Sequence, residues 1–468
     1  MRTGLFPALA LVAAELPPGA GCTSGADPRD ATESCVQETC VAQCLADGGR
    51  FPRCSDGGCV CLSNGLDCCV MDDGGRPEDA AEDAAEDAPE CLVPVPVEVR
   101  PGASPGVACT RVSISTVEDG LLSYDGDGRS VVFVGTDHPP QPLWAFDRTS
   151  RCLSLLDDLS ETAEPYTHAL DPSLDGMDVA YAVQWTGTDN SVWNWQLRLA
   201  RNLVRPTYRV LDEMLGPRDR EPRMDFVSLD SPWVVWRDIR QSNGYHWDAF
   251  ALNIDTDERR NLSLDPVTEE RRWGSVVKVD LLDTVAVFDY GAGGGSEPLV
   301  LEIVSVDLTT GVYTQITDAP AQQCYPTITP HWIAWIDQRN HPDLPCTWPF
   351  GCSADIFGYN RDTGATQALV VAGESCQGPT LDGEGDWIAY DDQRDGTDVT
   401  MSLDREEDIY ALHLPTMTEV RITDWPGFEM RPRVVDRGDG TYSVLLVEEL
   451  DYGGALYRLW DCTLPEFP

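Results

Sequence analysis

Lysine is almost absent from this chain of 468 residues, which contains only Lys278. All basic residues together number 33 against 79 acidic residues, so the formal net charge at pH 7 is −46. A nucleic acid partner is therefore not expected, because binding a polyphosphate requires lysine and arginine to displace condensed counterions. The acidic excess is explained most simply by solubility and self-repulsion, with calcium or cationic partners as the alternative.

Long apolar runs and common catalytic motifs are also missing. No stretch approaches 18 consecutive apolar residues, so no transmembrane helix is expected. There is no G-x-S-x-G elbow, no phosphate-binding G-x-x-x-x-G-K and no H-E-x-x-H. No metal-ligand spacing relates the six histidines, His138, His168, His246, His331, His341 and His413. The sequence therefore predicts no cofactor and no metal, and it does not favour an enzyme.

Seventeen cysteines indicate an oxidising compartment, where disulfides persist. The apolar run LFPALALVAA near the N-terminus has the length of a signal-peptide core, so residues 1–21 are predicted to be a signal peptide. The small residues before Cys22 resemble the end of a bacterial lipoprotein signal, which implies that Cys22 is lipidated. Removing Cys22 leaves an even number of cysteines that can pair. We expect an exported protein on the outer membrane or cell surface, in contact with the membrane only through a lipid anchor. A periplasmic or secreted protein is the alternative.

A polar spacer, residues 22–34, precedes a cysteine-rich module at residues 35–69. Six of its cysteines have the spacing C-x4-C-x3-C-x9-C-x4-C-x-C, and a segment this small needs covalent staples because burial alone cannot fold it. Cys40 and Cys44 would lie one turn apart on a helix, and Cys59 and Cys61 on one face of a strand.

This module resembles the cysteine-stabilised αβ scaffold of defensin-like peptides. The resemblance implies three disulfides, Cys35–Cys54, Cys40–Cys59 and Cys44–Cys61. Antimicrobial members are usually cationic and this segment is not, so we interpret the module as a rigid extracytoplasmic unit. A toxin-like effector and a zinc cluster are the alternatives. Residues 70–90 then repeat EDAA, which stacks like charges four residues apart and predicts a disordered acidic tether.

The rest of the chain, residues 91–468, contains a repeat of 48 to 56 residues. The unit is centred on an apolar run such as WVVWRDIRQ, WIAWIDQRN or WIAYDDQRD. Each unit begins with a leading segment that ends in a turn, as in LDGMD or LDGEGD, and the apolar run follows this turn. Next come a further strand, such as DIFGYN or DIYALH, and a closing strand. Four short strands per unit predict the blades of an all-β propeller with antiparallel sheets. Aligned on the last core residue of each run, the seven units are centred on Phe133, Tyr181, Trp236, Val287, Trp335, Tyr390 and Leu446.

These units resemble the TolB-type, WD-like propeller repeats of bacterial exported proteins. The phrases LDGxxDWIAY and D-I-Y/F followed by D-T-G carry the resemblance, which spans roughly residues 110–465. The small α/β domain that precedes the propeller in TolB itself is missing, so a role in the Tol envelope system does not follow.

Seven blades are predicted, with six plus an extra sheet as the alternative. The seventh unit lacks a closing strand, which the segment CTRVSIS from Cys109 can supply, so that no sheet edge is left open. Cys109 and Cys462 would then lie on neighbouring strands and form a disulfide. Two further pairings are predicted: Cys346–Cys352, which would staple the insertion HPDLPCTWPFGC, and Cys324–Cys376, which lie near the start of the leading segments of adjacent units.

Three blades carry a D-x-R box that is a candidate binding site. An Asp/Arg pair in each could ring a central funnel, or each arginine could fix the end of its own strand. Recurrence at one repeat position favours the structural role. The three boxes are Asp238/Arg240, Asp337/Arg339 and Asp392/Arg394.

Two short motifs are interpreted as turns: Asp125 and Asp127 in SYDGDGRS, which resemble the start of a calcium loop, and Arg437-Gly438-Asp439. The sequence thus predicts an exported lipoprotein whose propeller binds an unknown protein or small ligand. A propeller enzyme of the polysaccharide lyase or hydrolase type, with a funnel active site, is the alternative.

Overall fold

The computed structural model describes residues 51–55, 58–62, 92–113, 123–135, 141–159, 166–186, 192–217, 223–239, 247–264, 275–292, 300–340, 355–371, 377–392, 394, 407–450 and 456–467. The chain divides into two compact units, Met1–Gly75 and Arg76–Pro468. All regular elements in these ranges are β-strands. The described part of the chain includes no helix of the length and apolarity needed to cross a membrane.

The first unit contributes one described hairpin. Strand β1 (Phe51–Ser55) pairs antiparallel with β2 (Gly58–Leu62), with Cys54 opposite Cys59. The predicted strand through Cys59 and Cys61 is therefore present. The three disulfides of this module remain predictions. Four further predictions concern segments outside the described residues: a signal peptide at residues 1–21, a spacer at 22–34 with Cys22, a helix through Cys40 and Cys44, and a tether at 70–90.

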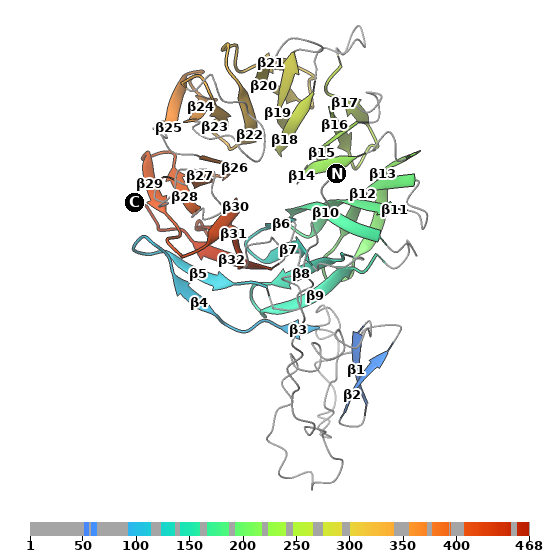
Figure 1. Cartoon of the computed structure of the whole chain (residues 1–468). Helices are drawn as coiled ribbons and strands as arrows, with labels where there is room; N and C mark the ends of the chain where they lie inside the picture. Colours follow the sequence, from blue (N-terminus) through green and yellow to red (C-terminus); the bar gives the residue numbers. More distant parts are fainter. Residues whose placement is uncertain are drawn as a thin grey trace, which may run out of the picture. The chain divides into compact units, whose positions relative to one another are not determined.

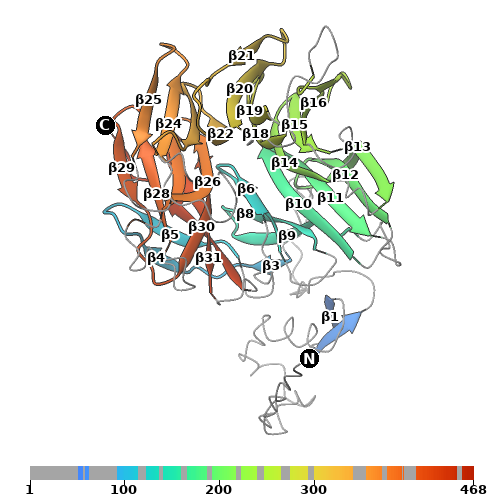
Figure 2. The same ribbon diagram turned by 45° about the horizontal axis from the view of Figure 1, so that its top comes forward.

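The second unit is a β-propeller of seven blades, as predicted, arranged in a ring in chain order (Figure 1). Each blade has four antiparallel strands that follow one another outward from the axis, and in the last blade the fourth strand comes from the start of the domain. Two blades carry a fifth, outermost strand. Figure 2 shows the same ring tilted, with the sheets seen side by side.

The first four blades contain the following strands, in order from the axis outward. Blade 1 has β6 (Ser123–Gly126), β7 (Ser130–Val134), β8 (Leu143–Asp147) and β9 (Cys152–Asp157). Blade 2 has β10 (Tyr166–Asp175), β11 (Asp178–Thr186), β12 (Val192–Arg201) and β13 (Thr207–Pro217). Blade 3 has β14 (Met224–Asp230), β15 (Trp233–Asp238), β16 (Asp248–Asn253) and β17 (Arg259–Asn261). Blade 4 has β18 (Val276–Leu282), β19 (Val285–Ala292), β20 (Val300–Asp307) and β21 (Tyr313–Gln315).

The last three blades follow the same order. Blade 5 has β22 (Gln323–Ile328), β23 (Trp332–Asp337), β24 (Asp355–Asn360) and β25 (Thr366–Val370). Blade 6 has β26 (Gln377–Glu384), β27 (Trp387–Asp392), β28 (Asp408–His413) and β29 (Thr418–Arg421). Blade 7 has β30 (Phe428–Asp436), β31 (Tyr442–Glu449), β32 (Tyr457–Thr463) and β5 (Ala108–Arg111).

The second strand of each blade is buried on both faces because it packs between two neighbouring sheets. Trp335 on β23 is fully buried, as expected for the centre of WIAWIDQRN, and packs with Ile333 and Val287 in the cluster between blades 4 and 5. In the fourth unit the predicted alignment is off by one residue. Phe288, not Val287, packs towards the preceding blade, as Trp236 does in its own unit. A shift of one residue moves a strand side chain to the opposite face.

The ring is closed by strand β5, from the first part of the propeller domain, as predicted. Strand β5 pairs antiparallel with β32, with Cys109 directly opposite Cys462. These two cysteines form a disulfide that links residues 353 positions apart, and both are fully buried. The first and last segments of the domain are therefore joined by backbone hydrogen bonds and by a covalent bond.

The segment before β5 forms two further strands that the sequence did not predict. Strand β3 (Val93–Pro94) extends blade 1 beyond β9, and β4 (Val99–Pro101) extends blade 7 beyond β5. Arg151 of blade 1 donates side-chain hydrogen bonds to the carbonyls of Val95, Pro96 and Arg111. Residues 92–111 thus form a strap across the junction of blades 1 and 7. The sequence does not predict these strands because proline alternates with valine in this segment. Proline cannot donate a backbone hydrogen bond to a neighbouring strand and is confined to the edges of sheets.

The other predicted disulfides are described only in part. Cys324 is disulfide-bonded, but its predicted partner Cys376 lies outside the described residues. Cys346 and Cys352 lie outside them as well.

Candidate functional site

The innermost strands of the blades surround a cavity on the propeller axis. Its volume is about 250 Å³, and residues of β6, β10, β14, β18, β22, β26 and β30 line it. Among the described residues, two basic side chains line the cavity, Lys278 and Arg433. Eight carboxylates line it as well: Asp125, Asp127, Asp175, Asp230, Asp280, Asp382, Glu384 and Asp436.

Most of these carboxylates come from the leading segments of the repeat, which the sequence interpretation treated only as turns. The segments LSYDGDG, PSLDGMD, PTLDGEGD and RVVDRGDG each form the end of an innermost strand and the turn after it. Because the innermost strands lie next to the axis, one acidic turn in a blade places its side chains in the cavity. Repetition of the unit around the ring then gathers these side chains at one point.

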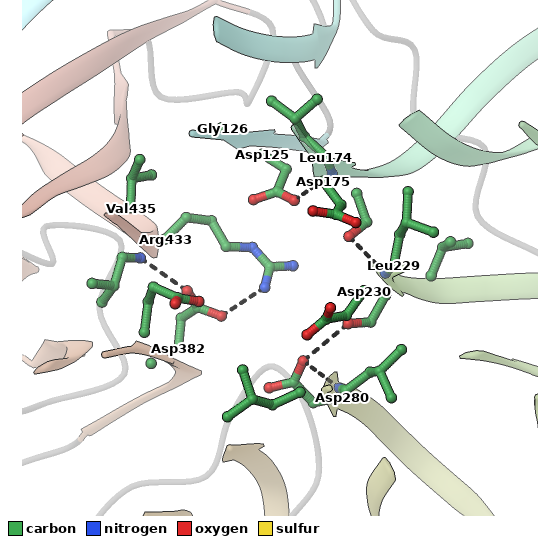
Figure 3. Close-up of a pocket in the computed structure, with 18 of the residues that line it drawn as sticks. Asp125, Gly126, Leu174, Asp175, Leu229, Asp230, Asp280, Asp382, Arg433 and Val435 are labelled. Carbon is green, nitrogen blue, oxygen red and sulfur yellow. Dashed lines mark hydrogen bonds and ion pairs between the residues drawn. The ribbon is translucent and has the colours of Figure 1, made fainter. Parts of the chain in front are cut away.

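Deep in the cavity, carboxylates of three blades each bind a backbone amide of the following blade (Figure 3). Asp125 Oδ2 accepts a hydrogen bond of 2.8 Å from the backbone N–H of Leu174, and Asp382 Oδ2 accepts one of 2.9 Å from the N–H of Val434. Asp280 Oδ2 accepts from the N–H of Ile328 at 3.2 Å. Each of these bonds joins the innermost strands of two successive blades, so these carboxylates are structural acceptors.

The carboxylates nearer the turns bind backbone amides in the same way. Asp175 Oδ2 accepts from the N–H of Ser231 at 2.8 Å, and Asp230 Oδ2 accepts from the N–H of Asp283 at 2.5 Å. Each of these aspartates fixes the turn of the following blade. Their positions are therefore set by the ring itself before any ligand binds.

Two basic side chains partly offset the acidic lining. The guanidinium of Arg433 extends towards the axis between Asp382 and Asp125, and its Nη1 donates to Asp382 Oδ1 at 2.7 Å (Figure 3). Lys278 is buried, and its Nζ donates to the carbonyl of Leu381 at 2.8 Å. Even without Glu384, seven acidic side chains face two basic ones, so the cavity favours a positively charged group.

Burial and mutual repulsion shift the pKa values in the cavity. Burial raises the pKa of Asp125 to about 6. Burial raises the pKa of Glu384 to about 8, and the nearby carboxylates of Asp382 and Asp280 add to the rise. Burial alone would lower the pKa of Arg433, but the carboxylates around it outweigh that effect and raise it. Glu384 is therefore the carboxyl of this cavity that changes its charge near neutral pH.

The carboxylates of this cavity, held in place by backbone N–H groups, are suited to binding a cation. Among the described residues no group of three or more His, Cys, Asp and Glu side chains is placed to hold a metal ion.

The D-x-R boxes do not contribute described residues to this cavity. In blade 5, Asp337 is fully buried and accepts from Arg339 Nε at 2.9 Å and from Arg339 Nη2 at 2.6 Å. The indole N–H of Trp335 donates to the same carboxylate at 2.8 Å, and the guanidinium lies 4.0 Å from the ring centre of Phe357. The box therefore ties the end of its own strand to the blade.

The other two boxes have the same geometry where they are described. Arg394 Nε donates to Asp392 Oδ2 at 2.6 Å, and the guanidinium lies 4.6 Å from the ring centre of Tyr410. The indole of Trp236 donates to Asp238 Oδ2 at 3.0 Å, while Arg240 lies outside the described residues. A ligand-binding role for the three boxes remains a prediction.

A second aspartate lies opposite each box, which the sequence interpretation did not connect with it. The register pairs Asp238 with Asp248, Asp337 with Asp355 and Asp392 with Asp408, and all six are buried. The second member of each pair is the first residue of the D-A-F, D-I-F or D-I-Y phrase. The aspartate of each box and the first aspartate of the following strand are therefore cross-strand neighbours, and two like charges lie side by side in the blade.

The two turn motifs are turns in the structure. Asp127 Oδ1 accepts from the backbone N–H groups of Arg129 and Ser130, which closes the turn between β6 and β7. Arg437 lies in the turn between β30 and β31, and its Nη1 donates to Asp461 at 2.6 Å. Asp127 lines the axial cavity in addition, so the first motif is part of the candidate site.

Comparison with known proteins supports the fold and leaves the function open. No family model and no curated protein matches the chain. Among solved structures, the β-propeller domain of the Trilobed protease from Pyrococcus furiosus aligns with 9% identity and a TM-score of 0.51, over 75% of this chain and 94% of that one. That domain has an open velcro topology, whereas in this chain β5 and the Cys109–Cys462 disulfide close the ring.

Two other similar structures belong to different functional classes. Oligogalacturonate lyase from Vibrio parahaemolyticus has 12% identity and a TM-score of 0.48, over 80% of this chain and 98% of its own. TolB from Acinetobacter baumannii has 13% identity and a TM-score of 0.40, over 66% of this chain and 67% of its own. At these identities the likeness concerns the propeller fold alone.

Proposed function

We propose that this protein is an exported binding module whose propeller takes a positively charged group, from a small ligand or a protein side chain, into its axial cavity. One observation carries the proposal: eight acidic side chains from the blades, seven of them besides Glu384, line a cavity of about 250 Å³ that holds two basic side chains. Coulomb attraction between opposite charges is strengthened in a site partly shielded from water. A cation is therefore the ligand class that this cavity favours.

The rigid lining of the cavity supports a binding function. Asp175, Asp230 and Asp280 each accept a backbone N–H from the next blade, so their positions cost no reorganisation when a ligand arrives. A preorganised site loses less of its interaction energy to ordering. The disulfide between Cys109 and Cys462 adds a covalent closure to the same ring.

Calorimetric titration with a small diamine, putrescine, tests the proposal. Asp230→Asn keeps an oxygen for the N–H of Asp283 but removes one negative charge, so the dissociation constant should rise about tenfold. The affinity should also fall as salt is added, since ions screen the attraction. Asp362→Asn, which removes an exposed carboxylate outside the cavity, is the matched control. Equal affinities for the wild type and Asp230→Asn would contradict a cation site on the axis.

A second candidate function is an enzyme that uses Glu384 as an acid or base. The observation in its favour is the pKa of Glu384, which burial and the neighbouring carboxylates raise to about 8. A carboxyl that titrates near the working pH is typical of general acid–base catalysis. Under this hypothesis Glu384→Gln abolishes turnover of an oligosaccharide substrate. Under the binding hypothesis there is no turnover to lose, and cation affinity at neutral pH changes little because Glu384 is already largely protonated.

Export and lipidation at Cys22 belong to the same proposal. A disulfide buried in the core and a further disulfide-bonded cysteine, Cys324, support folding in an oxidising compartment. Labelled palmitate should be incorporated into the wild type and be lost in Cys22→Ala. A wild-type protein that takes up no label would refute the anchor while leaving the cavity proposal intact.

A further inference from the structure

At the junction between blades 1 and 7, two arginine side chains meet at one aspartate. Arg148, in the turn after β8 of blade 1, donates through Nη1 to Asp461 Oδ2 on β32 of blade 7. Arg437 of the β30–β31 turn donates to the same oxygen at 2.6 Å. Two guanidinium groups therefore share one carboxylate oxygen, in a protein whose overall charge is strongly negative.

Two donors of this cluster find no acceptor within the described ranges. The side chain of Arg148 is 9% exposed, and its Nε and Nη2 are buried without a hydrogen-bond partner among the described residues. Asp461 Oδ1 is unpartnered in the same part of the structure, but one water can satisfy that single acceptor. Arg148 has more unpaired donors than that one acceptor can use, and a buried donor without a partner destabilises the fold, most of all when it is charged.

Neighbouring acids in the described part of the chain do not complete the cluster. Asp127 also acts electrostatically on Arg148, but its Oδ1 is bound by two backbone N–H groups of its own turn. Burial lowers the pKa of Arg148 to about 9, and the guanidinium of Arg437 adds to that effect. This direction agrees with a cation that lacks part of its counter-charge.

We propose that a small inorganic anion of the size of chloride binds between Arg148 and Arg437 at the junction of blades 1 and 7. The anion accepts hydrogen bonds from Arg148 Nε and Nη2 and neutralises the second guanidinium. A small ion fits better than an organic acid, because both nitrogens are buried. The side chain of Arg437 is 27% exposed, so the cluster is in contact with solvent through this residue. This site is separate from the axial cavity and does not depend on the function proposed for it.

Anion binding would stabilise the ring where its two ends meet. Asp461 lies one residue before Cys462, and its strand pairs with the closing strand β5. A ligand that binds only the folded state stabilises that state by mass action. Chloride should therefore strengthen the closure of the propeller.

Thermal unfolding at constant ionic strength and pH tests this proposal. When gluconate is replaced by chloride, the melting temperature of the wild type should rise by about 1–2 °C. Arg148→Gln should abolish that rise. Arg198→Gln is the matched control, because Arg198 is similarly buried but its donors reach Asp157 and Gln196. A rise of the same size in Arg148→Gln as in the wild type would overturn the proposal.

Bromide soaked into crystals of the wild type gives an independent measurement that needs no variant. An anomalous peak within about 3.5 Å of Arg148 Nε or Nη2 is expected. Water alone at that position would refute the anion site. If Arg148→Gln does not fold, the bromide result decides.

Discussion

At the scale of single residues, the D-x-R arginines compensate pairs of buried aspartates. Asp337 and Asp355 lie opposite each other on β23 and β24, and both are fully buried. Like charges in neighbouring positions repel, so the fold needs a cation beside them. The hydrogen bonds from Arg339 to Asp337 place one there and raise the pKa of that arginine. The recurrence of the box in three blades follows from the recurrence of the paired aspartates.

Replacing Arg339 by alanine should therefore lower the free energy of unfolding by about 2–3 kcal/mol, because it leaves buried carboxylates without their cation. Chemical denaturation measures the change. The double variant Arg339→Ala/Asp355→Asn should recover part of the loss, since it removes one of the two repelling charges. Arg129→Ala, at a side chain that is 56% exposed, should change stability by less than about 0.5 kcal/mol.

A different outcome would revive the binding hypothesis for the boxes. If Arg339→Ala left stability unchanged but weakened binding of a ligand, the arginine would serve recognition and not strand packing.

At the scale of elements, strand β5 decides whether the ring has an open edge. Its four residues pair with four residues of β32, from Ala108 opposite Thr463 to Arg111 opposite Trp460. Without β5 the edge of β32 would be available for pairing with another chain, and Trp460, now fully buried, would lose part of its cover.

A chain that begins at residue 114 should therefore aggregate, whereas a chain that begins at residue 92 should stay monomeric in light scattering. The second chain keeps β3, β4 and β5 and is the control for truncation as such. A soluble monomer from the shorter chain would show that β32 tolerates an open edge.

The disulfide contributes to closure in addition to the strand. Cys109→Ser/Cys462→Ser should reduce the free energy of unfolding by about 3–5 kcal/mol, since the bond closes a very long loop in the unfolded chain. Urea denaturation under oxidising conditions measures the loss. Unlike the truncated chain, this variant should remain soluble because β5 is still present. Full stability in the variant would mean that the strand alone holds the ring.

At the scale of the whole molecule, buried carboxyls link stability to pH. Burial is the first cause of raised pKa values in Asp125 and Asp391, both to about 6, in Glu384 to about 8 and in Glu429 to about 9. The folded state holds these protons at pH values where the unfolded chain has released them. Stability from these groups is therefore present at low pH and falls as pH rises through the raised values.

The melting temperature should accordingly fall between pH 5.5 and pH 8.5 in differential scanning calorimetry. General repulsion among the many acidic residues acts in the same direction, so a variant must separate the two causes. Glu384→Gln removes one titrating group while keeping the cavity filled, and its melting temperature should fall less over this range. If the variant and the wild type fall equally, Glu384 does not contribute to the pH dependence.

The local pattern of the chain was sufficient to predict the propeller, its seven blades and the strand that closes it. Strand periodicity and repeat length can be read directly from the sequence. Counting WIAWIDQRN and its counterparts gives seven units, and comparing these units shows that the last one lacks its closing strand. The Cys109–Cys462 pair followed from that count. Strands β3 and β4 are not predictable from the sequence, because Pro-rich segments lack a clear alternation of apolar and polar residues.

Only the tertiary structure decided where the acidic turns meet and which charges share a site. Asp125 and Asp382 lie far apart in the sequence and in different blades, yet closure of the ring brings both to the axis beside Arg433. Arg148 and Asp461 likewise become neighbours only because the first and last blades are joined. Local sequence determines each blade, but contacts across the axis and across the closing junction depend on the number of blades and the register of their strands.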